Sequence, residues 1–431
     1  MQMKSIILII LLLLITFNAE AGELIKKGEA LNLERCIEIA LTKHPNIVSF
    51  ANTVKVNQSR VGEAAANYYP QIDLTSGYSR ISSSSRSTSD LSTDIDNTFD
   101  EYTGSVTLKQ NLYDFGKTAA QVRVQDLNLD SSRADLENAS QQIVLNVKQA
   151  YYGVLKATRD RDVAEEAVKQ SQQHLEQAKG FYEVGTKPKF DVTKAEVDLS
   201  NSRLNLIRAE NALRIAIVTL NNAMGVPEAP EFDIEDNLSF QVYVITFDEA
   251  IMKAYKNRPD LESIIFKRQS AESSVTLAEK GYYPALTGSA SYSRSGEEFP
   301  LDEGWNAGVT LSFPIFSGFL TKHQVGESRA NLNVQRANEE ALRQNIFLEV
   351  QQAYLNLKEA GERIPAAGIV VKQAEENLEL ANGRYKAGVG NPIEVTDAQV
   401  SLSSAKSSYI QALYDYKTAH ASLEKAMGER R

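Results

Sequence analysis

The chain has 431 residues, a formal net charge of −10 at pH 7, four histidines and one cysteine. An acidic chain argues against a nucleic-acid partner, because phosphate binding needs a basic surface. The single Cys36 permits no disulfide within the chain, and the scattered histidines lack metal-ligand spacing. The sequence therefore predicts no metal site, no cofactor and no enzyme activity.

Residues 1–21 are predicted to be a secretory signal peptide. Lys4 precedes an apolar run from Ile6 to Ile15, and Ala19-Glu20-Ala21 supplies a cleavage site. The run of about ten residues is short for a bilayer span, which needs about 20. No cysteine lies directly after it, so we do not expect a lipid anchor. We expect an exported chain without a transmembrane helix, and a retained anchor is the alternative.

An internal duplication covers almost all of the remaining chain. Three motifs recur at a constant separation of 203 positions (385 − 182 = 203), which indicates two structural repeats. The pairs are Gln149-Ala150-Tyr151 with Gln352-Ala353-Tyr354, Tyr182-x-x-Gly185 with Tyr385-x-x-Gly388, and Met224-Gly225 with Met427-Gly428. We divide the chain into a first repeat (22–225), a connector rich in proline and acidic residues (226–245) and a second repeat (246–431).

Nearer the N-terminus the separation is 214, as between Tyr68-Tyr69-Pro70 and Tyr282-Tyr283-Pro284. The difference (214 − 203 = 11) places about eleven extra residues in the first repeat between Arg80 and Val106. Each repeat is predicted to open with a helix, over 32–68 and over 246–282. A proline interrupts each of these helices, because proline lacks the N–H that the helix needs.

Four segments then change to a period of two. The predicted strands are 71–80, 102–113, 285–294 and 304–315. In each of them apolar side chains alternate with polar ones, which indicates one apolar and one polar face.

A helical hairpin completes each repeat, over 116–223 and over 318–427. Apolar residues recur at alternating steps of three and four, with large and small side chains in turn, as in a coiled coil. In the second repeat the series ends Ala374, Leu378, Ala381, Tyr385. The first helix of a hairpin, about 65 residues long, extends on the order of 95 Å. We expect Pro365 to kink or interrupt the second long helix.

The strands fit the wall of a transmembrane β-barrel. Four strands cannot close a lumen, because free edges leave backbone groups unpaired in lipid. Two chains would supply eight strands and little lumen, and three chains would supply twelve. Aromatic residues expected near the strand ends are candidates for a membrane-interface belt. They are Tyr78, Tyr102, Tyr292 and Trp305. The alternative is two soluble hairpins whose aromatic residues form a small core.

The duplicated helix-strand-strand-helix-helix plan, the Tyr-Tyr-Pro entries to the strands and the Tyr-x-x-Gly turns resemble the TolC family of outer-membrane efflux proteins. The resemblance implies a mainly α homotrimer, with a twelve-stranded outer-membrane β-barrel continued by a long periplasmic α-helical barrel. It implies the exit duct of a tripartite efflux pump or type I secretion system. The implied partners are outer-membrane lipid, a periplasmic adaptor protein and an inner-membrane transporter of the RND, ABC or a similar class.

The resemblance also assigns roles to the hairpin turns. Residues that match the periplasmic constriction of the family are Asp191, Tyr385, Glu394 and Asp397. Residues that match its adaptor-contacting tips are Val184, Gly185, Thr186, Ala387, Gly388 and Val389. The tip arginine of the family falls at Gly390, so we expect its restraining link to be missing or replaced. The alternative for Asp191 and Glu394 is that they only begin the following helices, where acidic side chains favour the helix dipole.

The end of the chain, an alternative function and the exported substrate remain to be considered. The chain stops at Arg431, so the family's C-terminal contribution to the equatorial region is expected to be short or absent. A structural or adhesive coiled-coil protein of the cell envelope is the alternative to a transport duct. The exported substrate and the choice between efflux and protein secretion are not determined by the residues.

Overall fold

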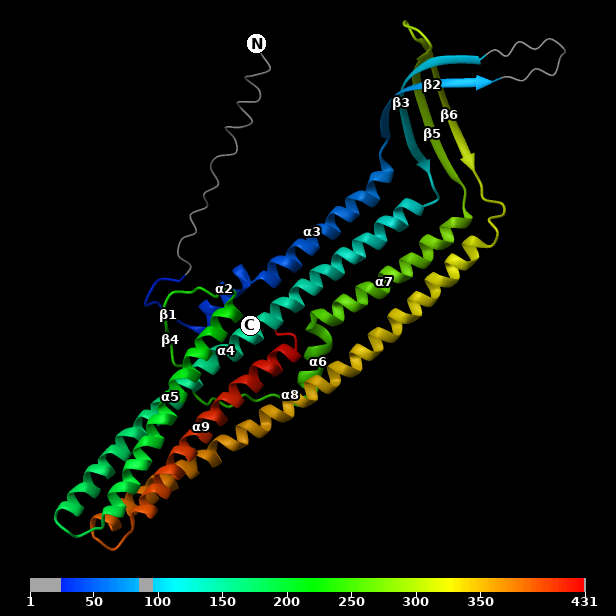
Figure 1. The fold of residues 1–431 in the computed structure, drawn as a ribbon. Helices are drawn as coiled ribbons and strands as arrows, with labels where there is room; N and C mark the ends of the chain where they lie inside the picture. The colour runs from blue at the N-terminus through cyan, green and yellow to red at the C-terminus, as the bar shows by residue number, and fades with distance from the viewer. Residues whose placement is uncertain (1–24, 85–95, 430–431) are drawn as a thin grey trace, which may run out of the picture. The chain divides into compact units, whose positions relative to one another are not determined.

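The computed structural model describes residues 25–84 and 96–429, and the predicted signal peptide lies outside them. The elements of the first repeat are α2 (Leu33–Lys43), α3 (Pro45–Ala65), η1 (Ala66–Tyr68), β2 (Gln71–Ser84), β3 (Asp96–Tyr113), α4 (Lys117–Glu183) and α5 (Lys189–Met224) (Figure 1). Those of the second are α6 (Phe247–Asn257), α7 (Pro259–Glu279), η2 (Lys280–Tyr282), β5 (Ala285–Gly296), β6 (Asp302–Ser312), α8 (Leu320–Lys386) and α9 (Pro392–Ala426). Among the described residues, no helix combines the length and apolar character that crossing a membrane requires.

The helices and strands follow the predicted order, and proline begins α3 and α7 as the interruptions required. The chain forms two compact units, and each unit takes an equivalent half of both repeats. One unit contains the four long strands with residues 48–139 and 246–351. The other contains the helix-hairpin turns with residues 140–245 and 352–425. The sequence repeats and the compact units therefore divide the chain along different lines.

The four long strands form one antiparallel sheet in the order β2-β3-β5-β6. Its register aligns the apolar positions of all four strands on the same face, because Ile72 lies opposite Leu108, Val106 opposite Tyr292, and Leu286 opposite Leu311. Within residues 25–84 and 96–429 no segment covers this face, and several of its side chains are exposed. They include Ile72, Leu74, Tyr78, Val106, Tyr292, Trp305, Val309 and Leu311. The predicted alternation is confirmed.

Strands β2, β3 and β5 run further than predicted, which changes where Tyr78 and Tyr102 lie. Tyr78 pairs with Tyr102, and Tyr292 pairs with Trp305. Tyr78 is seven residues from the start of β2 (78 − 71 = 7), and β2 continues beyond it to Ser84. The expectation that these aromatics lie near the strand ends is therefore wrong for Tyr78 and Tyr102, because serine, threonine and charged residues also pair beyond them. Trp305 does lie near a strand end, three residues after the start of β6 (305 − 302 = 3). Their role at a membrane interface stays a prediction.

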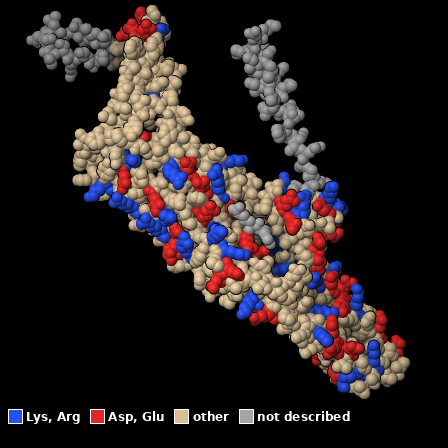
Figure 2. Space-filling model, turned by 180° about the vertical axis from the view of Figure 1, so that it is seen from behind, with Lys and Arg blue, Asp and Glu red and all other residues tan. Residues whose placement is uncertain are grey.

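Charged side chains are scarce along the sheet. Figure 2 shows the strands as a band almost free of charge, with acidic side chains gathered at the end away from the helices. At that end the cations Arg80 and Arg294 are paired with Asp100 and Glu303. The middle of the sheet thus presents an uncharged surface.

The connector 226–245 is anchored rather than free. Its short strand β4 (Asp233–Ile234) pairs in parallel with β1 (Ala30–Leu31). The Tyr151 hydroxyl of α4 donates to the Glu235 carbonyl at 2.6 Å. Arg159 binds both carboxylate oxygens of Asp236. Backbone pairing and a bidentate ion pair therefore hold the connector to the middle of α4.

The predicted 3-4 seam forms the core of each hairpin. In the first hairpin the buried seam residues are Leu175, Ala178, Ala195 and Leu199. In the second they are Ala374, Leu378, Ala381, Tyr385, Val395, Ala398, Leu402 and Ala405. Along each seam, alanine alternates with larger apolar side chains. The alanines let the two helices of a hairpin approach closely, and the larger side chains between them fix the register.

Helix α8 is continuous through Pro365, so an interruption there is wrong, and a kink stays a prediction. Proline removes one backbone hydrogen bond, but the turn around it is held by the seam, where Ala360 and Ile364 are buried. Gly361 adds to this packing, because a Cβ there would lie 3.4 Å from the Tyr416 ring of α9. Packing against α9 thus outweighs one missing bond in a helix of 67 residues.

The glycine of each repeated Met-Gly motif packs against the backbone at the end of the first helix of the same repeat. Gly225 and Gly428 have φ values of 75° and 72°, in the left-handed region that favours glycine. A Cβ at Gly225 would lie 2.8 Å from His44 Cα, and one at Gly428 would lie 2.7 Å from the Asn257 carbonyl carbon. Each glycine is therefore required both by its own backbone and by the backbone packed on it.

We predict that Gly225→Ala and Gly428→Ala each lower the free energy of unfolding by at least about 2 kcal/mol, since left-handed backbone alone costs an L-residue 1–2 kcal/mol. The control is Gly153→Ala in α4, where a Cβ meets nothing within 4 Å. It should be neutral or stabilising by up to about 1 kcal/mol. Thermal unfolding followed by circular dichroism measures all three, and equal effects at the three sites would contradict the prediction.

Candidate functional site

The two helix-hairpin turns present similar backbones. Gly185 and Gly388 each adopt a positive φ just after a long helix, at 74° and 80°. The N–H groups that follow them return to the last helical turn, where Thr186 donates to Phe181 O and Val389 donates to Arg384 O. These bonds satisfy carbonyls at the helix ends, as glycine-terminated helices require.

The six residues predicted to contact an adaptor are all exposed at these turns. Val184 and Val389 keep 70% and 69% of their surface in solvent, although both are apolar. Each turn therefore presents one apolar side chain beside a glycine.

Asp191 and Tyr385, predicted separately from the two repeats, meet in the structure. Asp191 stands in the first turn of α5 and is 4% exposed, and Tyr385 in the last turns of α8 is fully buried. The Tyr385 hydroxyl donates to Asp191 Oδ2 at 3.3 Å. Burial and the Asp191 charge raise the pKa of Tyr385 to about 12, so the hydroxyl remains a donor at physiological pH. This bond joins the two hairpins.

Lys187 makes a second link between the hairpins. Its Nζ donates to the Gly390 carbonyl at 3.2 Å and lies 5.2 Å from the centroid of the Tyr385 ring. Gly390 itself has no room for a side chain, because a Cβ would lie 2.9 Å from Tyr385 N. A lysine of the first turn thus reaches the backbone of the second, at the position where the resemblance placed an arginine.

Aromatic contacts complete the surroundings of Tyr385. Phe181 packs edge-on against its ring with centroids 5.7 Å apart, and the His174 ring lies 5.0 Å away. His174 is buried, and neither ring nitrogen has a hydrogen-bond partner among the described residues. Burial lowers the pKa of His174, although the nearby carboxylates of Asp198 and Asp191 act in the opposite direction. The ring is therefore held neutral.

Glu394 and Asp397 do not join the Asp191–Tyr385 contact. Asn391 caps α9 by accepting from Glu394 N at 3.0 Å, and the Glu394 carboxylate accepts from Arg384 Nε at 3.1 Å. Asp397 is exposed and has no partner in the described part of the chain. Glu394 thus begins a helix and forms an exposed ion pair, which leaves Asp397 as the unpaired carboxylate of this turn.

Sequence reasoning did not single out Lys187 or His174. The repeat offers a signal for both, because their counterparts 203 positions later are Gly390 and Asn377. Tyr385 shows the same asymmetry, since its counterpart Tyr182 is 46% exposed. Lys187 and His174 thus differ in side chain from their counterparts, whereas Tyr385 differs from Tyr182 only in burial.

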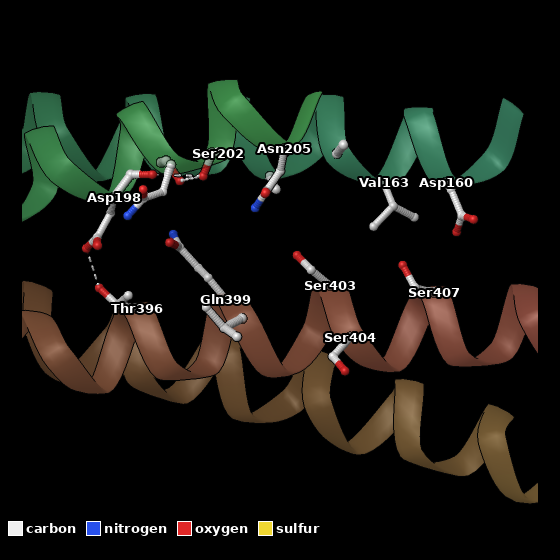
Figure 3. A pocket seen from close by; sticks show the side chains of 15 residues that line it. Asp160, Val163, Asp198, Ser202, Asn205, Thr396, Gln399, Ser403, Ser404 and Ser407 are labelled. Carbon is white, nitrogen blue, oxygen red and sulfur yellow. Dashed lines mark hydrogen bonds between the residues drawn. The ribbon is translucent and has the colours of Figure 1, made fainter. Parts of the chain in front are cut away.

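A polar groove of about 400 Å³ runs from this region along α4, α5 and α9 (Figure 3). At one end, Thr396 donates to Asp198 at 2.7 Å, and at the other end lies Asp160. The lining between them is mostly hydroxyl and amide side chains. It includes Asn201, Ser202, Asn205, Gln399, Ser403, Ser404 and Ser407.

A family model described as "Outer membrane efflux protein" matches residues 36–226 and 250–429, which is most of the chain. The chain belongs to the outer membrane efflux protein family. It is an outer-membrane protein, and this family is one of channel proteins rather than enzymes. The resemblance drawn from the duplicated motifs is confirmed.

Curated relatives and solved structures agree with this assignment. The outer membrane protein TolC of Vibrio cholerae is 24% identical over 427 residues, covering 95% of this chain and 94% of the relative. Protein CyaE of Bordetella pertussis is 26% identical over 415 residues, covering 93% and 84%. Crystal structures of CusC superpose with a TM-score of 0.81 at 18% identity and cover 92% of both chains. The outer membrane protein VceC from Vibrio cholerae gives 0.76 at 19% identity, covering 92% and 96%. The predicted fold class is confirmed.

We predict that lowering the pH loosens the turn region through His174. In the unfolded chain His174 binds a proton near pH 6.5, whereas burial lowers its pKa in the folded protein. Its contribution to folding stability is therefore fully present above about pH 6.5 and decreases as the pH falls below that value. The limiting slope is about 1.4 kcal/mol per pH unit. Hydrogen exchange of peptides from the turns, referenced to the unfolded peptides, should show less protection at about pH 5.5 than at about pH 7.5.

His174→Asn, which introduces the side chain of the second repeat, should remove this difference. The control is His323→Asn, since His323 is exposed on α8. Equal protection of the wild-type turns at both pH values would contradict the prediction.

Proposed function

We propose that this protein is the exit duct of a tripartite efflux pump or type I secretion system, and that it works as a homotrimer. It conducts substrates passively from a periplasm-spanning complex to the exterior. The observation that carries this proposal is the open four-stranded sheet, which exposes one continuous apolar face. In the described part of the chain no further strand pairs with its edge strands β2 and β6.

An open sheet cannot remain single in a membrane. Each unpaired backbone group at its edges costs several kcal/mol in hydrocarbon, so the edges must pair with other copies of the chain. Two copies give eight strands, which side chains nearly fill, whereas three copies give twelve and leave a water-filled lumen. A trimeric barrel therefore agrees with a family of channels, and a dimer does not.

The repeats keep their predicted roles in this proposal. Residues 22–225 and 246–431 each supply two strands and one helix hairpin per subunit, and the connector 226–245 lies in the equatorial region. The turns lie at the periplasmic tip. A periplasmic adaptor contacts the exposed apolar positions Val184 and Val389 with their neighbouring glycines, and through the adaptor the duct serves an inner-membrane transporter.

The contacts between the turns form the gate of the duct. The Asp191–Tyr385 bond and the Lys187 link to Gly390 tie the second hairpin to the first within one subunit. Glu394 and Asp397 repeat three times around the axis. Carboxylates about 8 Å apart repel each other by roughly 2 kcal/mol at an effective dielectric constant near 20. Such rings attract cations into the constriction.

The relatives' names include both kinds of export. Brucella suis has an outer membrane efflux protein BepC at 28% identity over 185 residues, and Pseudomonas aeruginosa has an alkaline protease secretion protein AprF at 22% over 346 residues. The duct proposal is compatible with either, because a passive duct leaves the choice of substrate to the transporter.

We predict that the purified protein, reconstituted in a planar bilayer, gives discrete conductance steps. The expected oligomer is a trimer by native mass spectrometry in detergent. Silent bilayers from a folded trimer would exclude the duct and favour the structural or adhesive envelope protein.

We predict that Glu394→Gln with Asp397→Asn raises the single-channel conductance or lowers cation selectivity, because two acidic rings lose their charge. The matched control is Glu376→Gln with Glu379→Gln, which removes two exposed carboxylates from α8. Current–voltage curves in asymmetric salt measure both properties. If the double variant matches the control, Glu394 only begins α9 and pairs with Arg384, and Asp397 has no part in conduction.

A further inference from the structure

Three corners between strands and helices lie side by side at the helical end of the sheet. They are the β3–α4 corner (113–117), the α7–β5 corner (280–284) and the β6–α8 corner (313–322). A Cβ at Gly116 would lie 4.0 Å from Lys280 Cε, and a Cβ at Gly281 would lie 2.9 Å from Thr321 Cγ2. These close approaches form one continuous row, which we call the junction row.

Each corner of the junction row carries one lysine, and none of these lysines has a carboxylate partner among the described residues. They are Lys117, Lys280 and Lys322. Lys117 and Lys322 are exposed, and Lys280 is partly so. The Lys280 ammonium lies 4.8 Å from the centroid of the Tyr283 ring, and that of Lys322 lies 5.8 Å from Phe319. The aromatic rings hold the ammonium groups without neutralising them.

The acidic residues Asp114 and Glu279, next to these corners in the sequence, already have other partners. Asp114 accepts hydrogen bonds from Gly116 N, Thr118 N and the Thr118 hydroxyl, so it caps the start of α4. Glu279 pairs with Arg329 at 2.9 Å. A polar groove of about 640 Å³ beside Lys117 also contains Arg60 and Glu63, whose charges cancel. The junction row therefore keeps a net positive charge.

The junction row continues the apolar face of the sheet. Leu112 lies on that face over Gly288, and beyond it Phe115 stacks on Tyr283 with centroids 6.0 Å apart. From the sheet toward the helices, the order is aliphatic side chains, then aromatic rings, then ammonium groups. Amphipathic side chains adopt this order where hydrocarbon gives way to lipid headgroups.

The spacing of the aromatics agrees with a bilayer boundary at this level. Tyr283 and Tyr292 are nine residues apart (292 − 283 = 9), as are Tyr69 and Tyr78. Nine residues of strand extend about 30 Å, or roughly 23 Å of height at the usual tilt, close to the apolar band of about 25 Å in outer-membrane barrels. The lysines then lie just outside the band.

We propose that Lys117, Lys280 and Lys322 bind the phosphate groups of anionic phospholipids in the periplasmic leaflet of the outer membrane. This rests on the proposed function, which places the helical end of the sheet on the periplasmic side. The three ammonium groups hold phosphates at the depth where the aromatic rings end. The lipid fixes the height of the barrel in the membrane.

The test uses the full-length protein in nanodiscs of equal parts phosphatidylglycerol and phosphatidylcholine, with retained lipid counted by native mass spectrometry after release into detergent. The wild type should retain phosphatidylglycerol in preference. Lys117→Gln with Lys280→Gln and Lys322→Gln should reduce that preference by about tenfold or more, since one lysine near an anionic surface contributes about fivefold. The control, Lys55→Gln with Lys256→Gln and Lys358→Gln, removes three exposed lysines that have no carboxylate partner in the described chain, and it should keep the preference.

Three outcomes would overturn the proposal. They are equal retention of the two lipids by the wild type, an unchanged preference in the junction-row variant, and complete displacement of the lipid by inorganic phosphate alone. Planar-bilayer recordings on the same variants separate this proposal from the duct. Normal conductance without lipid preference rejects only the junction row, and silent bilayers with preserved preference reject only the duct.

Discussion

The alternation of large and small side chains along the hairpin seams is the constraint on which the rest of this structure depends. Alanine at every second level brings the two helices of a hairpin close together, and the larger residues between them fix a single register. Because the register is fixed, Asp191 in the first turn of α5 and Tyr385 near the end of α8 are each held in position before they meet. Without the seam, the turns would have no defined geometry.

The two repeats share this seam but differ in the side chains at their turns. At equivalent positions the first turn has Lys187 and Asp191, and the second has Gly390 and Glu394. In the first hairpin Tyr182 is exposed, whereas in the second its counterpart Tyr385 is buried against residues of the first. The duplicated sequence thus supplies two similar hairpins, and the differences between them supply the contacts. A buried tyrosine, a neutral histidine and a single lysine–carbonyl bond tie one hairpin to the other.

Apolar surface and ion pairs lie on different kinds of element. The long strands expose an uncharged apolar face, and the long helices carry most of the ion pairs, such as those of Arg268 with Glu339 and Lys148 with Glu424. Between them, the junction row places lysines beside aromatic rings. The protein therefore changes at the junction row from a surface suited to hydrocarbon to one suited to water.

The sequence by itself determined the order of elements, the breaks at Pro45 and Pro259, the strand faces and the seams, because these depend on local periodicity and on the chemistry of proline. It also determined the family, since a duplication with constant spacing survives where overall identity is low. Only the tertiary structure decided that α8 continues through Pro365, that the strands extend past Tyr78, and that Asp191, Tyr385 and Lys187 meet. These depend on packing and pairing between segments that are separate in the chain, from Tyr78 and Tyr102 in neighbouring strands to Asp191 and Tyr385 in different repeats. No local pattern records which side chains such segments bring into contact.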